Sequence, residues 1–144
     1  MSIDISAEIA IERPRTDVAA FVMDPENDTA WIGGITESKN VTEGAIAVGS
    51  KVARTAKFLG RELNYVNEVT ELDEGRLLAM NAEKPFPMEI RYEFEDSGYG
   101  TLARVRVQGE GSGFFRLAAP LLAPMARRNV AGDLRRLKAI LEAG

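Results

Sequence analysis

The side chains that could carry chemistry in this 144-residue chain are limited, because it contains neither histidine nor cysteine. Histidine is the usual general base near neutral pH and the commonest metal ligand, and cysteine supplies thiolates. The composition therefore excludes Ser-His-Asp and Cys-His catalysis, disulfides, and zinc or iron sites built on imidazole or thiolate. Any reaction has to use carboxylates, tyrosine, lysine, arginine or the bound molecule itself. We expect no metal site and no cofactor.

Arg54 is the most unusual polar candidate, because it interrupts an apolar strand pattern over residues 50–59. If Val52 and Phe58 face inward, strict alternation brings Arg54 inward, where it would pair with a ligand carboxylate, enolate or phenolate. Phe58 would then line the same cavity. The opposite register, with Thr55 inside, or a β-bulge would expose Arg54. Of these arrangements, we favour the exposed one.

Aromatic and methionine side chains are expected to share one face of a sheet. They are Tyr65, Met80, Met88, Tyr92 and Phe94. A soft lining of this kind suits a pocket for an apolar ligand. The alternative is that these side chains pack directly on a helix with no space between. Tyr92 and Tyr65 are the best candidates for hydrogen bonding a ligand, since a buried hydroxyl needs a partner.

Three further residues are candidates for the rim or mouth of such a pocket. Trp31 is the only tryptophan, and we favour a role as core anchor over a role at the cavity mouth. Asn129 and Asp133 lie beside an apolar helical stripe, from which either could project a polar group toward a ligand. Asp133 is the best placed carboxylate on that helix to act as a general base. We favour a rim position in which it pairs with a neighbouring arginine.

The elements that must position these residues follow from the hydrophobic periodicity. Alternation of Met88, Ile90, Tyr92 and Phe94 with charged residues predicts a strand with one buried and one solvent-exposed face. The same reasoning predicts strands over 4–12, 35–42, 50–59, 62–72, 76–83, 87–95 and 101–109, two short helices from Thr16 and from Pro25 to Trp31, and a helix over 114–142.

The fold predicted from this order is α+β, with a curved antiparallel sheet of about seven strands around one long C-terminal helix. We expect residues 1–144 to form a single domain. Leu134, Leu137 and Leu141 mark the helical stripe that faces the sheet. Pro120 and Pro124 predict that the front of this helix begins late or is kinked.

Charge and hydropathy limit the partners. The net charge of −4 argues against nucleic-acid binding, which needs a basic face. The acidic, alternating start lacks the features of a signal peptide, so we expect a cytoplasmic protein. Residues 114–126 are too short and too broken by proline to span a bilayer. The segment 114–128 is interpreted as a portal beside the first helices, with a homodimer contact or a membrane contact as alternatives.

The chain resembles a known family in residues spread along its whole length. They are Ile9-Ala10-Ile11-Glu12-Arg13-Pro14, Val18, Phe21-Val22, Asp24-Pro25, Trp31, Gly49, Val69-Thr70-Glu71-Leu72, Arg76-Leu77, Leu134, Leu137-Lys138 and Leu141-Glu142. Together they resemble the START-like SRPBCC superfamily, in its polyketide cyclase/dehydrase-like branch. That resemblance implies a helix-grip fold with a cavity between sheet and long helix. Some members are aromatases or cyclases and many are carriers, and no universal catalytic motif is shared.

Three functions remain open from the sequence. The preferred one is binding of a small hydrophobic or aromatic molecule in the internal cavity. The second is a polyketide cyclase, aromatase or dehydratase, in which Tyr92, Arg54 or Asp133 would move protons. The third is a partner-binding module with a filled core. A greasy cavity would favour the first, a cavity with a buried ionisable cluster the second, and a packed core the third.

Overall fold

The computed structural model describes residues 2–58, 60–84, 87–110 and 114–144, with side-chain positions for 3–57, 60–84, 87–109 and 123–144. Its elements in chain order are β1 (Ser2–Ile11), α1 (Arg15–Val22), η1 (Pro25–Asn27), α2 (Asp28–Trp31), β2 (Ile35–Asn40), β3 (Lys51–Phe58), β4 (Arg61–Asp73), β5 (Leu77–Ala82), β6 (Met88–Ser97), β7 (Gly100–Glu110) and α3 (Phe114–Ala143). The predicted elements are all present, with ends that differ by a few residues.

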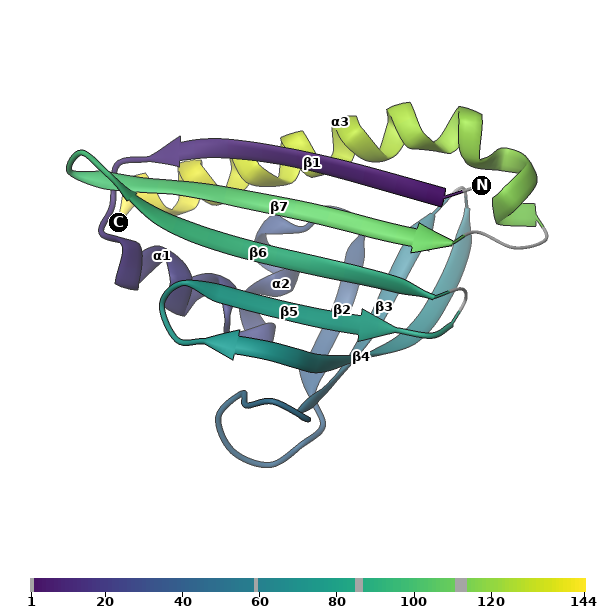
Figure 1. Ribbon diagram of the computed structural model, residues 1–144, viewed down its shortest axis with the longest axis horizontal. Coiled ribbons are helices and arrows are strands. Elements are labelled where there is room, and N and C mark those ends of the chain that lie inside the picture. The colour runs from purple at the N-terminus through teal and green to yellow at the C-terminus, as the bar shows by residue number, and fades with distance from the viewer. Residues whose placement is uncertain (1, 59, 85–86, 111–113) are drawn as a thin grey trace.

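The strands form one antiparallel sheet in the order β1-β7-β6-β5-β4-β3-β2. Each strand from β2 to β6 pairs with the next in sequence, and β1 pairs with β7. Figure 1 shows the sheet curving, with α3 running along β1 and the short helices α1 and α2 gathered at one end. This is the helix-grip arrangement that the sequence predicts.

The core lies between the covered face of the sheet and α3. Tyr92 and Phe94 of β6 pair in register with Val105 and Ala103 of β7, and all four are buried. The neighbours of Tyr92 and Phe94 in β6 are charged and lie on the other side of the sheet, so the alternation reflects one solvent-exposed face. Leu134 and Leu137 are 2% and 1% exposed, and Leu141 packs against the same core, which confirms the helical stripe.

The chain between β1 and β2 is held by local turn chemistry. The Asp24 side chain accepts a hydrogen bond from the Glu26 backbone N–H at 3.0 Å, and Pro25 follows in the first turn of η1. Asp24 and Pro25 therefore separate the end of α1 from the start of η1, which leads into α2. As a result, Asp28 and Trp31 of α2 both become buried against the sheet.

Pro120 and Pro124 predicted that helix α3 begins late or is kinked. The helix runs without a break from Phe114 to Ala143, so the late start is wrong and the kinked alternative remains. Figure 1 shows that its N-terminal part bends. A proline inside a helix removes one backbone hydrogen bond, and the helix bends at that point. Among the helices of the described ranges, none has the length and apolar character needed to cross a membrane.

Candidate functional site

A cavity of about 90 Å³ lies between the sheet, α2 and α3. Most of its walls are apolar, with polar groups from a few side chains. The lining residues are Trp31, Ile32 and Ile35 around α2 and β2, Arg54 and Tyr65 on β3 and β4, Ile90, Tyr92 and Val105 on β6 and β7, and Val130 and Asp133 on α3. The fold thus gathers Trp31, Arg54, Tyr65, Tyr92 and Asp133, five of the residues predicted from sequence, around one space.

Trp31 and Tyr92 form the aromatic wall of the cavity. Their rings meet edge to face, with centroids 6.0 Å apart and an interplanar angle of 64°. Both residues are 2% exposed. Among the described atoms, Trp31 Nε1 and Tyr92 Oη are buried without a hydrogen-bond partner. A buried polar group left unpaired costs roughly 1–3 kcal/mol of stability.

Arg54 is buried, which overturns the favoured exposed position. It is 5% exposed and shares the inward face of β3 with Val52, which is fully buried. Its guanidinium donates to Asp28 Oδ2 from Nε at 3.1 Å and from Nη2 at 2.8 Å, and Nη1 donates to Asn67 Oδ1 at 3.3 Å. A buried charge is tolerated only when paired and hydrogen bonded, and Asp28 supplies that partner.

Asp28, Asn67 and Ser38 were not predicted as site residues. Ser38 Oγ donates to Asp28 Oδ2 at 2.6 Å, so this oxygen accepts three hydrogen bonds. One sequence signal was available: Asp28 precedes Trp31 by three residues, and the two therefore share one face of a short helix. Nothing local distinguishes Asn67, since its role depends on the pairing of β4 with β3.

Burial controls the protonation of the two tyrosines. It raises the pKa of Tyr92 to about 12, against the opposing effect of the nearby Arg54 guanidinium. Burial also raises the pKa of Tyr65, which lies opposite Arg54 in the β3–β4 register, and Arg54 again opposes the rise. Both phenols therefore keep their protons at neutral pH and can donate hydrogen bonds.

Asp133 closes one side of the cavity. Its Oδ1 accepts from the Gly33 backbone N–H at 3.0 Å and from Arg136 Nη2 at 2.6 Å, and Arg136 Nε donates to the Trp31 carbonyl at 3.0 Å. These contacts confirm that Asp133 lies at the rim and pairs with an arginine. They also connect the chain after α2 to α3. Burial raises the pKa of Asp133, against the Gly33 N–H and Arg136. Asn129 is exposed and does not line the cavity.

The remaining predicted residues lie elsewhere. Met80 and Phe94 are 1% and 3% exposed core residues that do not line the cavity, so direct packing describes them. Met88 is half-buried and lines a different, larger hollow. The backbone of Phe58 pairs with Arg61, but its side chain lies outside the described residues.

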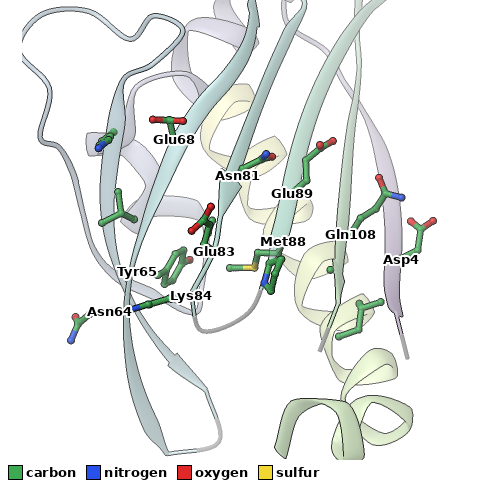
Figure 2. Close-up of a pocket in the computed structure, with 16 residues that line it drawn as sticks. Asp4, Asn64, Tyr65, Glu68, Asn81, Glu83, Lys84, Met88, Glu89 and Gln108 are labelled. Atoms are coloured by element: carbon green, nitrogen blue, oxygen red, sulfur yellow. The ribbon is translucent and has the colours of Figure 1, made fainter. Parts of the chain in front are cut away.

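Figure 2 shows this outer hollow, an open depression of about 1000 Å³ near the connection between β5 and β6. A row of polar side chains crosses it from strand to strand. In register these are Asp4, Gln108, Glu89, Asn81, Glu68 and Lys51. They alternate with core residues and therefore lie on the solvent face of the sheet. Tyr65, Ala82 and Met88 of the covered face also line this hollow, and Tyr65 lines both spaces. The smaller cavity has the more apolar walls, so it is the candidate site for an apolar ligand.

Comparison with known proteins agrees with this geometry. None of the curated proteins matches the chain. A protein of Thermus thermophilus has a similar structure, with a TM-score of 0.83, 19% identity and coverage of 98% of this chain and 99% of the other. A START superfamily protein from Mycobacterium smegmatis gives 0.80 with 15% identity and 97% coverage of both chains.

A further similar structure is the di-domain ARO/CYC StfQ from the steffimycin biosynthetic pathway. It gives a TM-score of 0.75 and 12% identity, and covers 99% of this chain and 52% of StfQ. At these identities the structures establish the helix-grip fold alone. The sequence itself matches one family over residues 2–142. The chain therefore belongs to the polyketide cyclase/dehydrase and lipid transport family.

Proposed function

We propose that this protein binds a small apolar or aromatic molecule in the cavity between the sheet and α3. The observation that carries the proposal is the wall formed by Trp31 and Tyr92. It sets two aromatic side chains against one space that Arg54, Tyr65 and Asp133 also line. Ligand sites combine apolar walls with a few placed polar groups in this way. The family's association with lipid transport and polyketide chemistry supports the same class of ligand.

The size of the cavity limits the ligand. Pockets for drug-sized molecules occupy roughly 300–1,000 Å³, and an engineered apolar cavity of about 150 Å³ holds benzene. At about 90 Å³, this space is smaller than the benzene-binding cavity, so it holds a short chain or part of a ring. The space is half open, so a larger ligand would extend out of it unless Val130 or Ile32, which form walls at α3 and after α2, moved outward.

Binding is better supported than proton-transfer catalysis. A general base needs a free acceptor of suitable pKa within reach of the substrate. Asp28 Oδ2 already accepts three hydrogen bonds, and Asp133 Oδ1 accepts two. Tyr92, with a pKa of about 12, holds its proton near neutral pH. Internal donors therefore hold one oxygen of each carboxylate, which supports a carrier over a cyclase, aromatase or dehydratase.

A cavity-filling variant tests the proposal. Val130→Phe places a ring in the space beside Trp31, so apolar ligands should no longer raise the melting temperature or change Trp31 fluorescence. Val66→Phe is the matched control, since Val66 is 49% exposed on the outer face. Its ligand response should equal that of the wild type. Equal responses from Val130→Phe and the wild type would contradict the proposed site.

A further inference from the structure

We propose that Asp133 and Arg136 of α3 form a latch on the turn after α2, residues 32–34, and that release of this latch opens the route by which a ligand enters and leaves the cavity. This inference rests on the proposed function and gives two side chains a positioning role in it. Three features of the structure support it: the exposure of the lining residues, the contacts that hold the turn, and the strength of the other walls.

The cavity comes close to solvent at the seam between this turn and α3. Ile32 of the turn and Val130 and Asp133 of α3 line the cavity and are half-buried. Trp31 and Tyr92, on the inner wall, are each 2% exposed. Helices α2 and α3 contact each other, so the turn that follows α2 lies beside α3. An outward movement of the turn at this seam would therefore open the cavity.

The latch consists of three hydrogen bonds to the chain around the turn. Asp133 Oδ1 accepts from the Gly33 N–H at 3.0 Å and from Arg136 Nη2 at 2.6 Å, and Arg136 Nε donates to the Trp31 carbonyl at 3.0 Å. The approach is close, since a Cβ atom at Gly33 would lie 2.6 Å from Arg136 Nη2. The Arg136 side chain therefore holds both the carboxylate and the backbone of the cavity wall.

These contacts are weaker than those of the other walls. The Asp133 and Arg136 side chains are 13% and 50% exposed, so water and salt screen their attraction. The strands β3 to β7 of the sheet wall each pair with a neighbour on both sides. Helix α3 is anchored by Leu134 and Leu137, which are 2% and 1% exposed. Local opening follows the weakest contacts, so the turn should move before the sheet or the helix does.

Exchange rates of a probe test the latch. Acetophenone is a one-ring compound, and line shapes of the Trp31 indole N–H resonance during an NMR titration give its binding and release rates. Arg136→Ala removes two hydrogen bonds, so both rates should rise about tenfold while the dissociation constant changes less than about twofold. Arg136→Lys should have a smaller effect, because one ammonium cannot reproduce the forked contact.

Arg135→Ala is the matched control, since Arg135 is the exposed neighbour of Arg136 on α3 and takes no part in the latch. Its rates should equal those of the wild type. Wild-type rates in Arg136→Ala would overturn the inference. A weaker dissociation constant without faster binding would also overturn it, because Arg136 would then only shape the wall.

A reversible cross-link tests the route itself. The chain has no cysteine, so Gly33→Cys with Asp133→Cys introduces a single pair, at positions where a Cβ on residue 33 lies 3.5 Å from Asp133 Oδ1. The reduced protein lacks the latch and should exchange acetophenone faster than the wild type. The oxidised protein, with its disulfide verified by mass spectrometry, should exchange it at least about tenfold more slowly than the reduced protein. Equal rates in the two forms would overturn the inference and indicate entry beside Tyr65 and Ile90, which are also half-buried.

Failure of the proposed function gives a different result. If neither acetophenone nor a broad apolar panel binds the wild type, the cavity is not a ligand site and both proposals fail. If acetophenone binds but the latch variants exchange it as the wild type does, the cavity binds ligands and only the latch fails.

Discussion

The buried ion pair between Arg54 and Asp28 provides the sharpest test of how the cavity wall is built. Asp28→Asn removes the negative charge but keeps the shape and one acceptor oxygen. Arg54 is 5% exposed and remains charged, since a guanidinium does not lose its proton in proteins. Its Nε and Nη2 lie 3.1 and 2.8 Å from the same Asp28 oxygen, and no other carboxylate of the described residues pairs with this guanidinium. Breaking a buried pair from one side typically costs about 3–5 kcal/mol of unfolding free energy.

The measurement is urea denaturation of the wild type and the variant at neutral pH. The matched control is Asp4→Asn on the outer face, which breaks the pair with Arg106, also 2.8 Å long, where each side chain is 50% exposed. An exposed pair contributes less than about 1 kcal/mol. A loss below about 1 kcal/mol for Asp28→Asn, matching the control, would refute the buried charge. The double variant Arg54→Met with Asp28→Leu should be more stable than Asp28→Asn, because no unpaired charge remains.

Three further predictions concern pH, packing and metals. Between pH 10 and about 12 the unfolded chain releases the proton that native Tyr92 retains, so the unfolding free energy should fall as pH rises through this window, and Tyr92→Phe should reduce that fall in denaturation curves. Leu137→Ala should cost about 2–5 kcal/mol because Leu137 is 1% exposed, whereas exposed Arg135→Ala should stay within about 0.5 kcal/mol, and a small loss for Leu137→Ala would contradict the core assignment. Chelator treatment should leave the melting temperature unchanged, and a fall that one specific metal restores would contradict this.

The fold could be predicted from sequence because its signals are local and repeated. The alternation at Met88, Ile90, Tyr92 and Phe94 fixes which side of β6 is covered, and neighbouring strands follow the same rule. The spacing of Leu134 and Leu137 identifies the helix that covers that face. Turn residues between the strands then leave little freedom in strand order, since neighbours in sequence pair antiparallel.

The site was less predictable because it depends on contacts between distant residues. The orientation of Arg54 could not be decided from β3 alone. Its charge is tolerated inside only because Asp28 lies 26 positions earlier, on a helix that folds back over the sheet. Which residues line the cavity could not be predicted from one strand either. Tyr92 and Phe94 share a face of β6, yet only Tyr92 lines the cavity. The difference depends on where α3 contacts the sheet.

Asn129 and Asp133 illustrate the same limit on the helix. They are one turn apart and equally close to the apolar stripe in sequence. Only Asp133 reaches the cavity, because Gly33 and Arg136 hold its carboxylate there. The position of the loop after α2, which decides this difference, leaves no trace in the helix sequence.

The most direct test of the ligand-binding cavity is an NMR titration that follows the Trp31 indole N–H. The chain has one tryptophan, so a single indole resonance reports on the cavity wall. We predict that acetophenone shifts this resonance in a saturable way, and that Val130→Phe abolishes the shift while Val66→Phe preserves it. A resonance that stays unmoved in the wild type at saturating concentrations of acetophenone and of a broad apolar panel would contradict the account.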